Sequence, residues 1–478
     1  MLKDAQIFIK GCDDVELGIK RKSRLEYRVS YDDERELEGI FFIVGGFGSN
    51  ADIRMLDFTR KKFATQLPIM VVNVFYHCFA CRKSNEEAYS AEFFITRQDV
   101  EGLKKLLAKL NLSLNASFNY NEHYASLEDL VRTQKEAGKF EADKKLRGLS
   151  YTIIPKNNDY QNYLIMPAID HILVLKDIQK RFQKVKTRIW PRPGAESVSA
   201  EARGASPESG DGINSSGENS GGNASPEARG SQRGSQPAGI GALPKIYGGG
   251  CYGGQIAHII AKIAPQHAQG VIDIACAPLP KYEMFMGREV GNSEFSNQTP
   301  HLFIDCYVQT LWTKETFTPA HFQIRALLNA AHLKIQSEAG GGGTIFVSYH
   351  SAQDEFDTAK DKQTLYEAYR ELGFDATLHL FKDEGDIDGR VVRDLTHGGI
   401  SNDRVFKKEL PKMLAKLRDR DFTAKEGQIA YPCGDKIFTF KDRGDRFTLE
   451  ITDPTSGGGG KTRLKSYPRE KSAEKVEV

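Results

Sequence analysis

One stretch of the chain decides the fold: Lys245-Ile246-Tyr247-Gly248-Gly249-Gly250-Cys251-Tyr252-Gly253-Gly254-Gln255-Ile256-Ala257. An apolar strand ends in glycines, a single nucleophilic side chain follows, and further glycines lead into an apolar helix. This order is typical of a nucleophile elbow in its G-x-S-x-G form, with the sulfur of Cys251 in place of a hydroxyl. Because such a turn strains the backbone of the nucleophile, the residues two before and two after it need to lack side chains. Gly249 and Gly253 meet that demand.

The helix after this turn would point its N-terminus at the sulfur of Cys251, and the partial positive charge there favours a thiolate. A phosphate-binding loop is the first alternative, but it would need Lys followed by Ser or Thr after its last glycine, and here Gln255 and Ile256 follow. An ordinary tight turn without chemistry remains the second alternative.

Short apolar runs recur on both sides of this stretch, as expected of strands buried on both faces of a parallel sheet. Segments with helical spacing of apolar residues alternate with them. The expected strands are residues 6–10, 25–30, 40–44, 69–75, 245–247, 271–275, 344–349 and 376–381. The expected helices are residues 100–110, 163–182, 256–263, 322–333, 361–372 and 402–417. This alternation predicts an α/β fold with a doubly wound, mostly parallel sheet.

Several segments interrupt the alternation. Residues 194–241 are mainly Gly, Ser, Ala, Glu and Pro and cannot bury enough apolar surface to offset their ordering entropy, so we expect a disordered internal insertion. Residues 111–162 and 281–338 are long for strand connections and predict helical cap insertions that form a lid over a pocket. We expect the main domain in two parts: residues 1–193, with a helical insertion, and residues 242–422, with the nucleophile, acid and His. The disordered insertion, residues 194–241, lies between them. Residues 423–456 are expected to form a small β appendage with a hairpin of residues 436–440 and 447–451, and residues 457–478 a flexible tail.

A second glycine-rich loop follows the strand expected at residues 40–44. It has the sequence Gly45-Gly46-Phe47-Gly48-Ser49-Asn50 and resembles the HGGG-type loop that supplies one oxyanion-hole N–H in esterases, without the His. The expected oxyanion donors are therefore the backbone N–H of Tyr252, the residue after the nucleophile, and that of Gly46 or Phe47. An ordinary strand-to-loop turn is the alternative.

A triad in hydrolase order needs an acid and then a His, each in a loop after a later strand. The strand at 344–349 is followed by Asp354, the favoured acid, and by Asp357, the second choice. After the strand at 376–381 comes a loop that ends in His397 and two glycines, just before a helix. Among eleven histidines, His397 alone combines this order with glycine neighbours and a loop position. For each of these residues, a surface loop position without a catalytic role is the alternative.

Composition narrows the classes of partner. Lys and Arg total 66 against 64 for Asp and Glu, a balance that argues against nucleic acid or an anionic membrane as partner. No stretch approaches the roughly 18 unbroken apolar residues of a membrane helix, and the first residues lack the pattern of a secretory signal. Seven scattered cysteines fit a reducing compartment better than a disulfide framework, so a cytoplasmic location is expected.

No cofactor or metal site is expected. The acidic run that begins at Asp383 invites a calcium interpretation, but the EF-hand spacing places Leu395 where the bidentate Glu must be. Cys78 and Cys81 have redox spacing but no following helix of the thioredoxin type, so packing at a strand end is favoured. His258 lies on the apolar helix after the elbow and is interpreted as a satisfied core residue.

Short sequence motifs along the chain resemble those of a known superfamily. They are Tyr76-His77-Cys78, the glycine-rich stretch from 249 to 264, Gly270-Val271-Ile272-Asp273, Phe346-Val347-Ser348-Tyr349-His350-Ser351, the run from 373 to 379 and Lys407-Lys408-Glu409-Leu410-Pro411. With the elbow and the order of the acid and His, they resemble the α/β-hydrolase superfamily, and more closely the bacterial domain of unknown function 2920 family. The resemblance implies an α/β-hydrolase fold and a hydrolase activity, without a substrate. Members of that family carry Ser at the elbow, so Cys251 is a departure; dienelactone hydrolases are similar enzymes in which Cys works at this place.

The pattern therefore predicts an acyl hydrolase of the esterase, thioesterase or lactonase type with a Cys-His-Asp triad, an acyl-enzyme and a small-molecule acyl substrate. Acyl transfer by the same triad is one alternative. A catalytically degenerate binding protein of the same fold is the other. The sequence leaves the substrate and the oligomeric state open.

Overall fold

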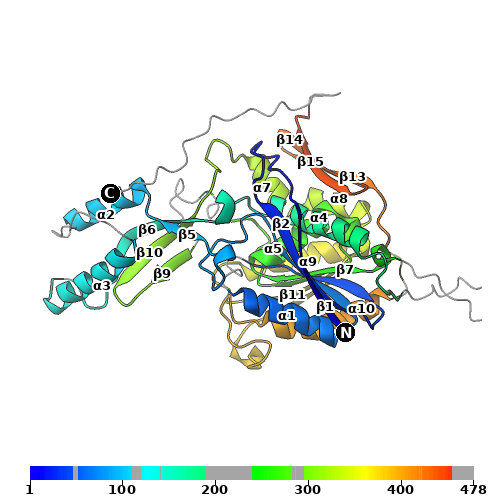
Figure 1. Ribbon diagram of the computed structural model, residues 1–478, viewed down its shortest axis with the longest axis horizontal. Helices are drawn as coiled ribbons and strands as arrows, with labels where there is room; N and C mark the ends of the chain where they lie inside the picture. The colour runs from blue at the N-terminus through cyan, green and yellow to red at the C-terminus, as the bar shows by residue number, and fades with distance from the viewer. Residues whose placement is uncertain are drawn as a thin grey trace, which may run out of the picture.

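The computed structural model describes residues 1–46, 52–109, 120–139, 141–188, 239–281, 286, 295–418, 420 and 422–454. An eight-stranded sheet runs through the main body (Figure 1). Its strands are β1 (Leu2–Lys10), β2 (Arg24–Asp32), β3 (Gly39–Ile43), β4 (Ile69–Phe75), β7 (Lys245–Gly250), β8 (Gly270–Ile274), β11 (Ile345–Ser351) and β12 (Asp375–Phe381). Their order across the sheet is β1-β2-β4-β3-β7-β8-β11-β12.

The sheet is parallel from β4 to β12, and only β2 breaks the direction, since it pairs antiparallel with both β1 and β4. Every residue of β3, β4, β8 and β11 is buried, which explains their unbroken apolar runs. Edge strand β1 instead has alternating half-buried and exposed residues. The carboxyl ends of the parallel strands meet along one edge of the sheet, where the loops that carry chemistry belong.

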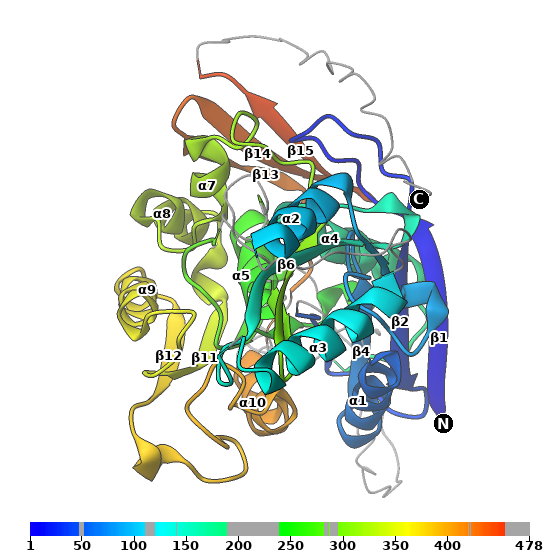
Figure 2. The same cartoon turned by 90° about the vertical axis from the view of Figure 1, so that its left-hand side faces the viewer.

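Helices cover both faces of the sheet (Figure 2). On one face, α1 (Ile53–Gln66) and α10 (Asn402–Leu417) share an apolar core with β3, β7, β8 and β11. On the other face lie α4 (Ile165–Arg181), α5 (Tyr252–Ile263) and α9 (Ala359–Glu371), with α7 (Pro319–Arg325) and α8 (Ala330–Glu338) outside them. All twelve residues of α5 are buried, in keeping with its apolar sequence.

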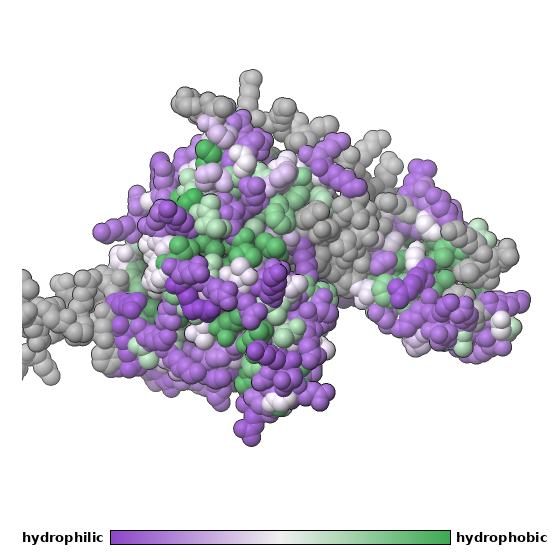
Figure 3. Space-filling view, turned by 180° about the vertical axis from the view of Figure 1, so that it is seen from behind, coloured by the Kyte–Doolittle hydropathy of each residue, from purple (hydrophilic) through white to green (hydrophobic). Residues whose placement is uncertain are grey.

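A second lobe, the cap lobe, projects from the main body, as Figures 1 and 3 show. It contains a four-stranded sheet in the order β5-β6-β10-β9 and two helices. The strands are β5 (Glu92–Phe94), β6 (Leu146–Ile154), β9 (Phe295–Gln298) and β10 (Leu302–Val308), and the helices are α2 (Arg97–Lys109) and α3 (Tyr120–Glu136). Because β6 pairs parallel with β10, the cap lobe joins two chain segments that are far apart in sequence. Side chains of both helices and of β6 and β10 share one apolar core.

A third sheet packs against the outer side of the main body. It consists of β13 (Gly427–Cys433), β14 (Lys436–Arg443) and β15 (Arg446–Thr452), all antiparallel. Its buried aromatic side chains, among them Phe438 and Phe440, join the core formed by α4 and α5. Hydrophilic side chains cover most of the described surface seen in Figure 3.

The architecture is the doubly wound α/β fold that the sequence predicts. Each of the eight expected strands coincides with a strand of the main sheet, and three of them extend one residue beyond the observed strand. The helix expected at 322–333 is wrong: it is two helices, α7 and α8. Ala326 is extended with ψ 122°, and the Asn329 side chain accepts the backbone N–H of His332 to begin the second helix. The cap insertions contain the expected helices and also a sheet that was not expected.

Three expectations fall wholly or largely outside the described residues. They concern the insertion at 194–241, the tail at 457–478 and the oxyanion donor Phe47. Only the last residues of the expected insertion are described. Ile240 there is 1% exposed and belongs to the main core, so its place is with the folded domain. The remaining domain limits stay a prediction.

Candidate active site

The turn between β7 and α5 is shaped by close backbone contacts. Cys251 has φ 49° and ψ −121°, a strained conformation that costs a non-glycine residue about 1–3 kcal/mol. Its N–H donates a hydrogen bond to the carbonyl oxygen of Ile274 at 2.7 Å. A Cβ at Gly249 would lie 2.5 Å from the carbonyl carbon of Gly253, and one at Gly253 would lie 2.4 Å from the carbonyl oxygen of Val44. Both positions therefore need glycine.

Cys251 is the exposed one of the seven cysteines, all of which lie in described parts of the chain. It immediately precedes α5, whose first-turn amides and dipole place partial positive charge beside the sulfur. An exposed thiol in such an electropositive position has the surroundings of a reactive cysteine.

His397 and Asp354 lie together at the same edge of the sheet. Asp354 follows β11, and His397 lies in the loop between β12 and α10. The Nδ1 atom of His397 is 2.8 Å from Oδ2 and 3.0 Å from Oδ1 of Asp354. The imidazole also lies near enough to Cys251 for the sulfur to raise the pKa of His397. His397 thus connects the thiol with the carboxylate.

Electrostatics at this pair favour the charged forms. Burial opposes the imidazolium, but the hydrogen bond with Asp354 and the interaction with Cys251 outweigh it and raise the pKa of His397 to about 10. Burial likewise opposes the Asp354 carboxylate. The hydrogen bond from His397 and the backbone N–H groups of Phe356 and Asp357 outweigh that effect and lower the pKa of Asp354.

Asp357, the second candidate acid, occupies a different place. It is 9% exposed, and its Oδ1 atom lies 3.6 Å from Nζ of Lys281. Burial raises the pKa of Asp357, although the charge of Lys281 opposes the shift. The ring of His397 therefore has Asp354 as its carboxylate partner, while Asp357 faces Lys281.

Of the expected oxyanion donors, Gly46 and Tyr252 are described. Gly46 lies against the elbow, since a Cβ there would be 3.0 Å from the carbonyl oxygen of Gly250 and 3.8 Å from the backbone nitrogen of Gly253. Tyr252 is the first residue of α5, so its N–H belongs to the helix N-terminus. Both backbone segments thus meet beside Cys251.

Hydrogen bonds of three tyrosine hydroxyl groups hold the loop after β3 and the start of α5 in place. The Tyr76 hydroxyl donates to the carbonyl oxygen of Gly45 at 2.8 Å, and the Tyr252 hydroxyl accepts the backbone N–H of Leu164 at 3.0 Å. The Tyr163 hydroxyl donates to the Gln255 side chain at 2.8 Å, and its ring lies 5.0 Å from that of Tyr252. The first contact ties the loop after β3 to the end of β4, and the other two tie the start of α5 to the start of α4.

Two side chains beside the site were not anticipated from the sequence. The ring of Phe356 meets the imidazole of His397 edge-on, with centroids 4.8 Å apart. The amide of Asn402 lies beside Gly250, since a Cβ at that glycine would be 2.8 Å from the amide nitrogen. The position of each residue in the sequence could have shown that it lies near the site: Phe356 is two residues after the favoured acid, and Asn402 begins the helix after His397.

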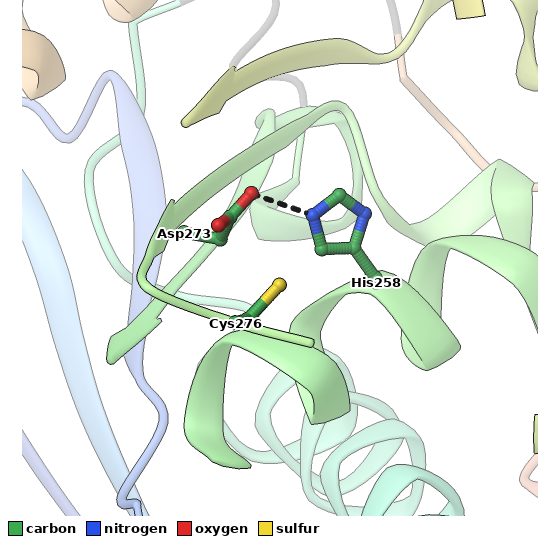
Figure 4. A group of neighbouring side chains, drawn as sticks. All are labelled: His258, Asp273 and Cys276. Carbon is green, nitrogen blue, oxygen red and sulfur yellow. Dashed lines mark hydrogen bonds and ion pairs between the residues drawn. The ribbon is translucent and has the colours of Figure 1, made fainter. Parts of the chain in front are cut away.

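A buried polar cluster supports the site from within (Figure 4). Asp273, at the end of β8, accepts from His258 at 2.8 Å, from Lys362 at 2.7 Å and from two hydroxyl groups. The two hydroxyls belong to Ser348 and Tyr366. Lys362 also donates to the carbonyl oxygen of Cys276 at 2.9 Å. The cluster thereby holds the loop after β8, next to the Ile274 carbonyl that accepts the N–H of Cys251.

Among the described residues, two groups have the atoms to hold a metal ion. One is His258, Asp273 and Cys276, and the other is Asp354, Asp357 and His397. In the first group, the Lys362 ammonium lies 2.7 Å from Asp273 and 3.0 Å from the Cys276 sulfur, so a cation already occupies the place of a metal. Both ring nitrogens of His258 are also hydrogen-bonded within the protein, which makes it a satisfied core residue. In the second group, the carboxylate of Asp354 is committed to His397 and to two backbone N–H groups.

A cavity of about 430 Å³ lies at the opposite ends of the strands, between the main sheet and β13–β15. None of its lining residues belongs to the Cys251 site. In the described part of the chain, no helix has the length and apolarity that crossing a membrane requires.

Comparison with solved structures gives distant similarities. A Bacteroides ovatus protein described as a dipeptidyl aminopeptidase IV is 9% identical with a TM-score of 0.39; the match covers 87% of this chain but only 36% of that protein, so the chain spans about a third of its length. A thermostable carboxyl esterase from Bacillus coagulans is 10% identical with a TM-score of 0.39, over 87% of this chain and 97% of that one. An esterase from Pyrobaculum calidifontis is 10% identical with a TM-score of 0.36, over 87% and 84%. A search of curated proteins found no significant match.

A family model matches residues 6–190 and 234–451, which is most of the chain and includes Cys251, Asp354 and His397. The interruption between the two matched parts, residues 191–233, overlaps most of the segment expected to be an insertion (194–241). The chain therefore belongs to the family described as protein of unknown function DUF2920.

Proposed function

We propose that this protein is an acyl hydrolase for ester, thioester or lactone bonds, with Cys251 as nucleophile, His397 as proton carrier and Asp354 as the acid that orients it. The observation that carries the proposal is the position of His397. Its imidazole is hydrogen-bonded through Nδ1 to the buried carboxylate of Asp354 at 2.8 Å, and it interacts with the exposed Cys251, whose sulfur raises the pKa of His397. A nucleophile, a base and an orienting group in mutual contact are what covalent acyl catalysis requires.

The first half-reaction forms an acyl-enzyme. His397 takes the proton of the Cys251 thiol and leaves a thiolate, since an imidazole with a pKa of about 10 holds a second proton at neutral pH. The sulfur of Cys251 attacks the carbonyl carbon, and the N–H groups of Tyr252 and Gly46 or Phe47 stabilise the oxyanion. As the intermediate collapses, the bond to the leaving group breaks, and His397 gives its proton to that group.

The second half-reaction restores the enzyme. His397 takes a proton from water, the resulting hydroxide attacks the thioester carbon, and the carbon–sulfur bond breaks to release the acid. Asp354 holds the imidazole in one orientation and stabilises its positive charge throughout. The cap lobe, to which the two long insertions contribute α3, β6, β9 and β10, is proposed to limit which substrates reach Cys251.

Activity assays with cysteine variants test the proposal. Wild type is assayed on short p-nitrophenyl esters and for alkylation by iodoacetamide, beside Cys251→Ala, Cys251→Ser and the control Cys12→Ala, which removes a half-buried thiol elsewhere. We expect Cys251→Ala to lose hydrolysis and the fast alkylation, and Cys12→Ala to keep both. Ester hydrolysis that survives in folded Cys251→Ala would overturn the proposal, as would wild type that is inert towards both reagents.

A further inference from the structure

Phe356 provides an apolar surface directly beside the proposed base. Its ring meets the His397 imidazole with centroids 4.8 Å apart, and the residue is 51% exposed. Its backbone N–H donates to Asp354 at 2.8 Å, so the proposed acid itself fixes the position of this residue. A substrate bound at Cys251 would therefore have an aromatic face next to the reacting carbonyl.

A cation also lies against that ring. The Nζ atom of Lys281 is 5.4 Å from the centroid of Phe356, within the range of a cation–π contact. It is also 3.6 Å from Oδ1 of Asp357, which is longer than a hydrogen bond. Within the described ranges, the ammonium donates no hydrogen bond, so its three donors have no acceptor there.

The exposed charge at this position is positive. The side chain of Lys281 is 34% exposed, whereas that of Asp357 is only 9% exposed. Burial also raises the pKa of Asp357, which makes its negative charge easier to neutralise. A molecule that approaches along Phe356 therefore meets the ammonium before the carboxylate.

We propose that Lys281 binds an anionic group of the substrate, so that the preferred acyl groups carry a carboxylate separated from the reacting carbonyl by a short apolar spacer. The spacer would lie along the ring of Phe356, and the carboxylate would accept the unused hydrogen bonds of Lys281. This inference rests on the proposed function, because it takes Cys251 as the reacting atom.

The test compares two p-nitrophenyl esters that differ in charge. One is the neutral butyrate ester, and the other is the monoester of glutaric acid, whose acyl chain ends in a carboxylate. Variants are Lys281→Met, Lys281→Glu and the conservative Lys281→Arg. Lys334→Met is the control, because it removes an exposed lysine from α8. The quantity compared is the ratio of kcat/KM for the anionic ester to that for the neutral one.

We expect Lys281→Met to lower this ratio about tenfold, mainly through KM for the anionic ester, and Lys281→Glu to lower it further. Lys281→Arg and Lys334→Met should keep the wild-type ratio, and added salt should lower the wild-type ratio. An unchanged ratio in folded Lys281→Met overturns the inference, and so does an equal loss on both esters.

A second measurement does not depend on turnover. Free glutarate should slow the alkylation of Cys251 by iodoacetamide in wild type and not in Lys281→Met, whereas the neutral compound butyramide should act equally on both. Protection that is equal in the two proteins overturns the inference. If wild type cleaves neither ester, the proposed function fails; if it cleaves both with a ratio that ignores Lys281, only the substrate class fails.

Discussion

Gly253 is the position where the smallest change should do the most damage to the elbow. A methyl group there would lie 2.4 Å from the carbonyl oxygen of Val44 and 3.1 Å from the carbonyl carbon of Gly45. Non-bonded heavy atoms rest about 3.5 Å apart, so Gly253→Ala should push α5 and the loop after β3 apart by about 1 Å. That displacement separates Cys251 and Tyr252 from Gly46. Since a 1 Å misplacement can cost about 100-fold in rate, we expect kcat to fall by about that factor.

The assay is steady-state hydrolysis of p-nitrophenyl butyrate, with thermal unfolding measured on the same samples. Gly102→Ala is the control, because nothing lies within 4 Å of a Cβ built at this residue of α2. It should leave kcat unchanged and slightly raise stability, as alanine does inside a helix. Folded Gly253→Ala with a kcat within about threefold of wild type would refute the reasoning.

Three further predictions follow from the same site. Asp354→Asn should lower kcat by about 10³- to 10⁴-fold in hydrolysis assays, because the amide cannot stabilise the imidazolium. The folded-state pKa of His397 is about 10 against an ordinary 6.5, so its stabilisation is complete below pH 6.5 and disappears as the pH rises through 10. The melting temperature should therefore fall across that range by more than in His397→Gln, and equal slopes would contradict this. Lys362→Met breaks a fully buried pair with Asp273, at a cost of about 3–5 kcal/mol, and should lower both stability and kcat. Lys176→Met, which breaks a similar buried pair with the third sheet, should lower stability but leave kcat unchanged. Equal kcat values in the two variants would show that the buried cluster in Figure 4 does not support the active site.

The main sheet was predictable because its signals are local. Strands such as β4 and β8 are buried along their whole length, so an unbroken apolar run marks each of them in the sequence. The glycines around Cys251 could also be recognised in the sequence, because the backbones of Val44 and Gly249 lie so close to the turn that no side chain fits there. The order of Asp354 and His397 along the chain follows from the positions of loops in this fold.

The cap lobe was only partly predictable. Buried and half-buried residues alternate with period two along strand β10, which is a local signal for a strand. The prediction of helical cap insertions overlooked this signal. Its partner β6 is more than 140 residues away in sequence, and no local pattern specifies such a pairing. Helix α1 was missed because only four of its fourteen residues are buried, which leaves a weak apolar stripe.

The contacts beside the site depend on tertiary structure as well. The sequence favours Asp354 and keeps Asp357 as the second choice, and only the fold directs one carboxylate to His397 and the other to Lys281. The edge-on contact of Phe356 with His397 joins two loops that follow different strands. Such contacts are set by how the loops pack and leave no periodic signal.

The most direct test of the central claim is to identify the atom that carries the acyl group. The protein is mixed with p-nitrophenyl butyrate, quenched in acid within the first turnover, digested and analysed by mass spectrometry. We expect one butyryl group on the peptide that contains Cys251, bound as a thioester that hydroxylamine removes, and none in Cys251→Ala. A burst of p-nitrophenol with the acyl group on another residue, or turnover without any acylated peptide, would contradict it.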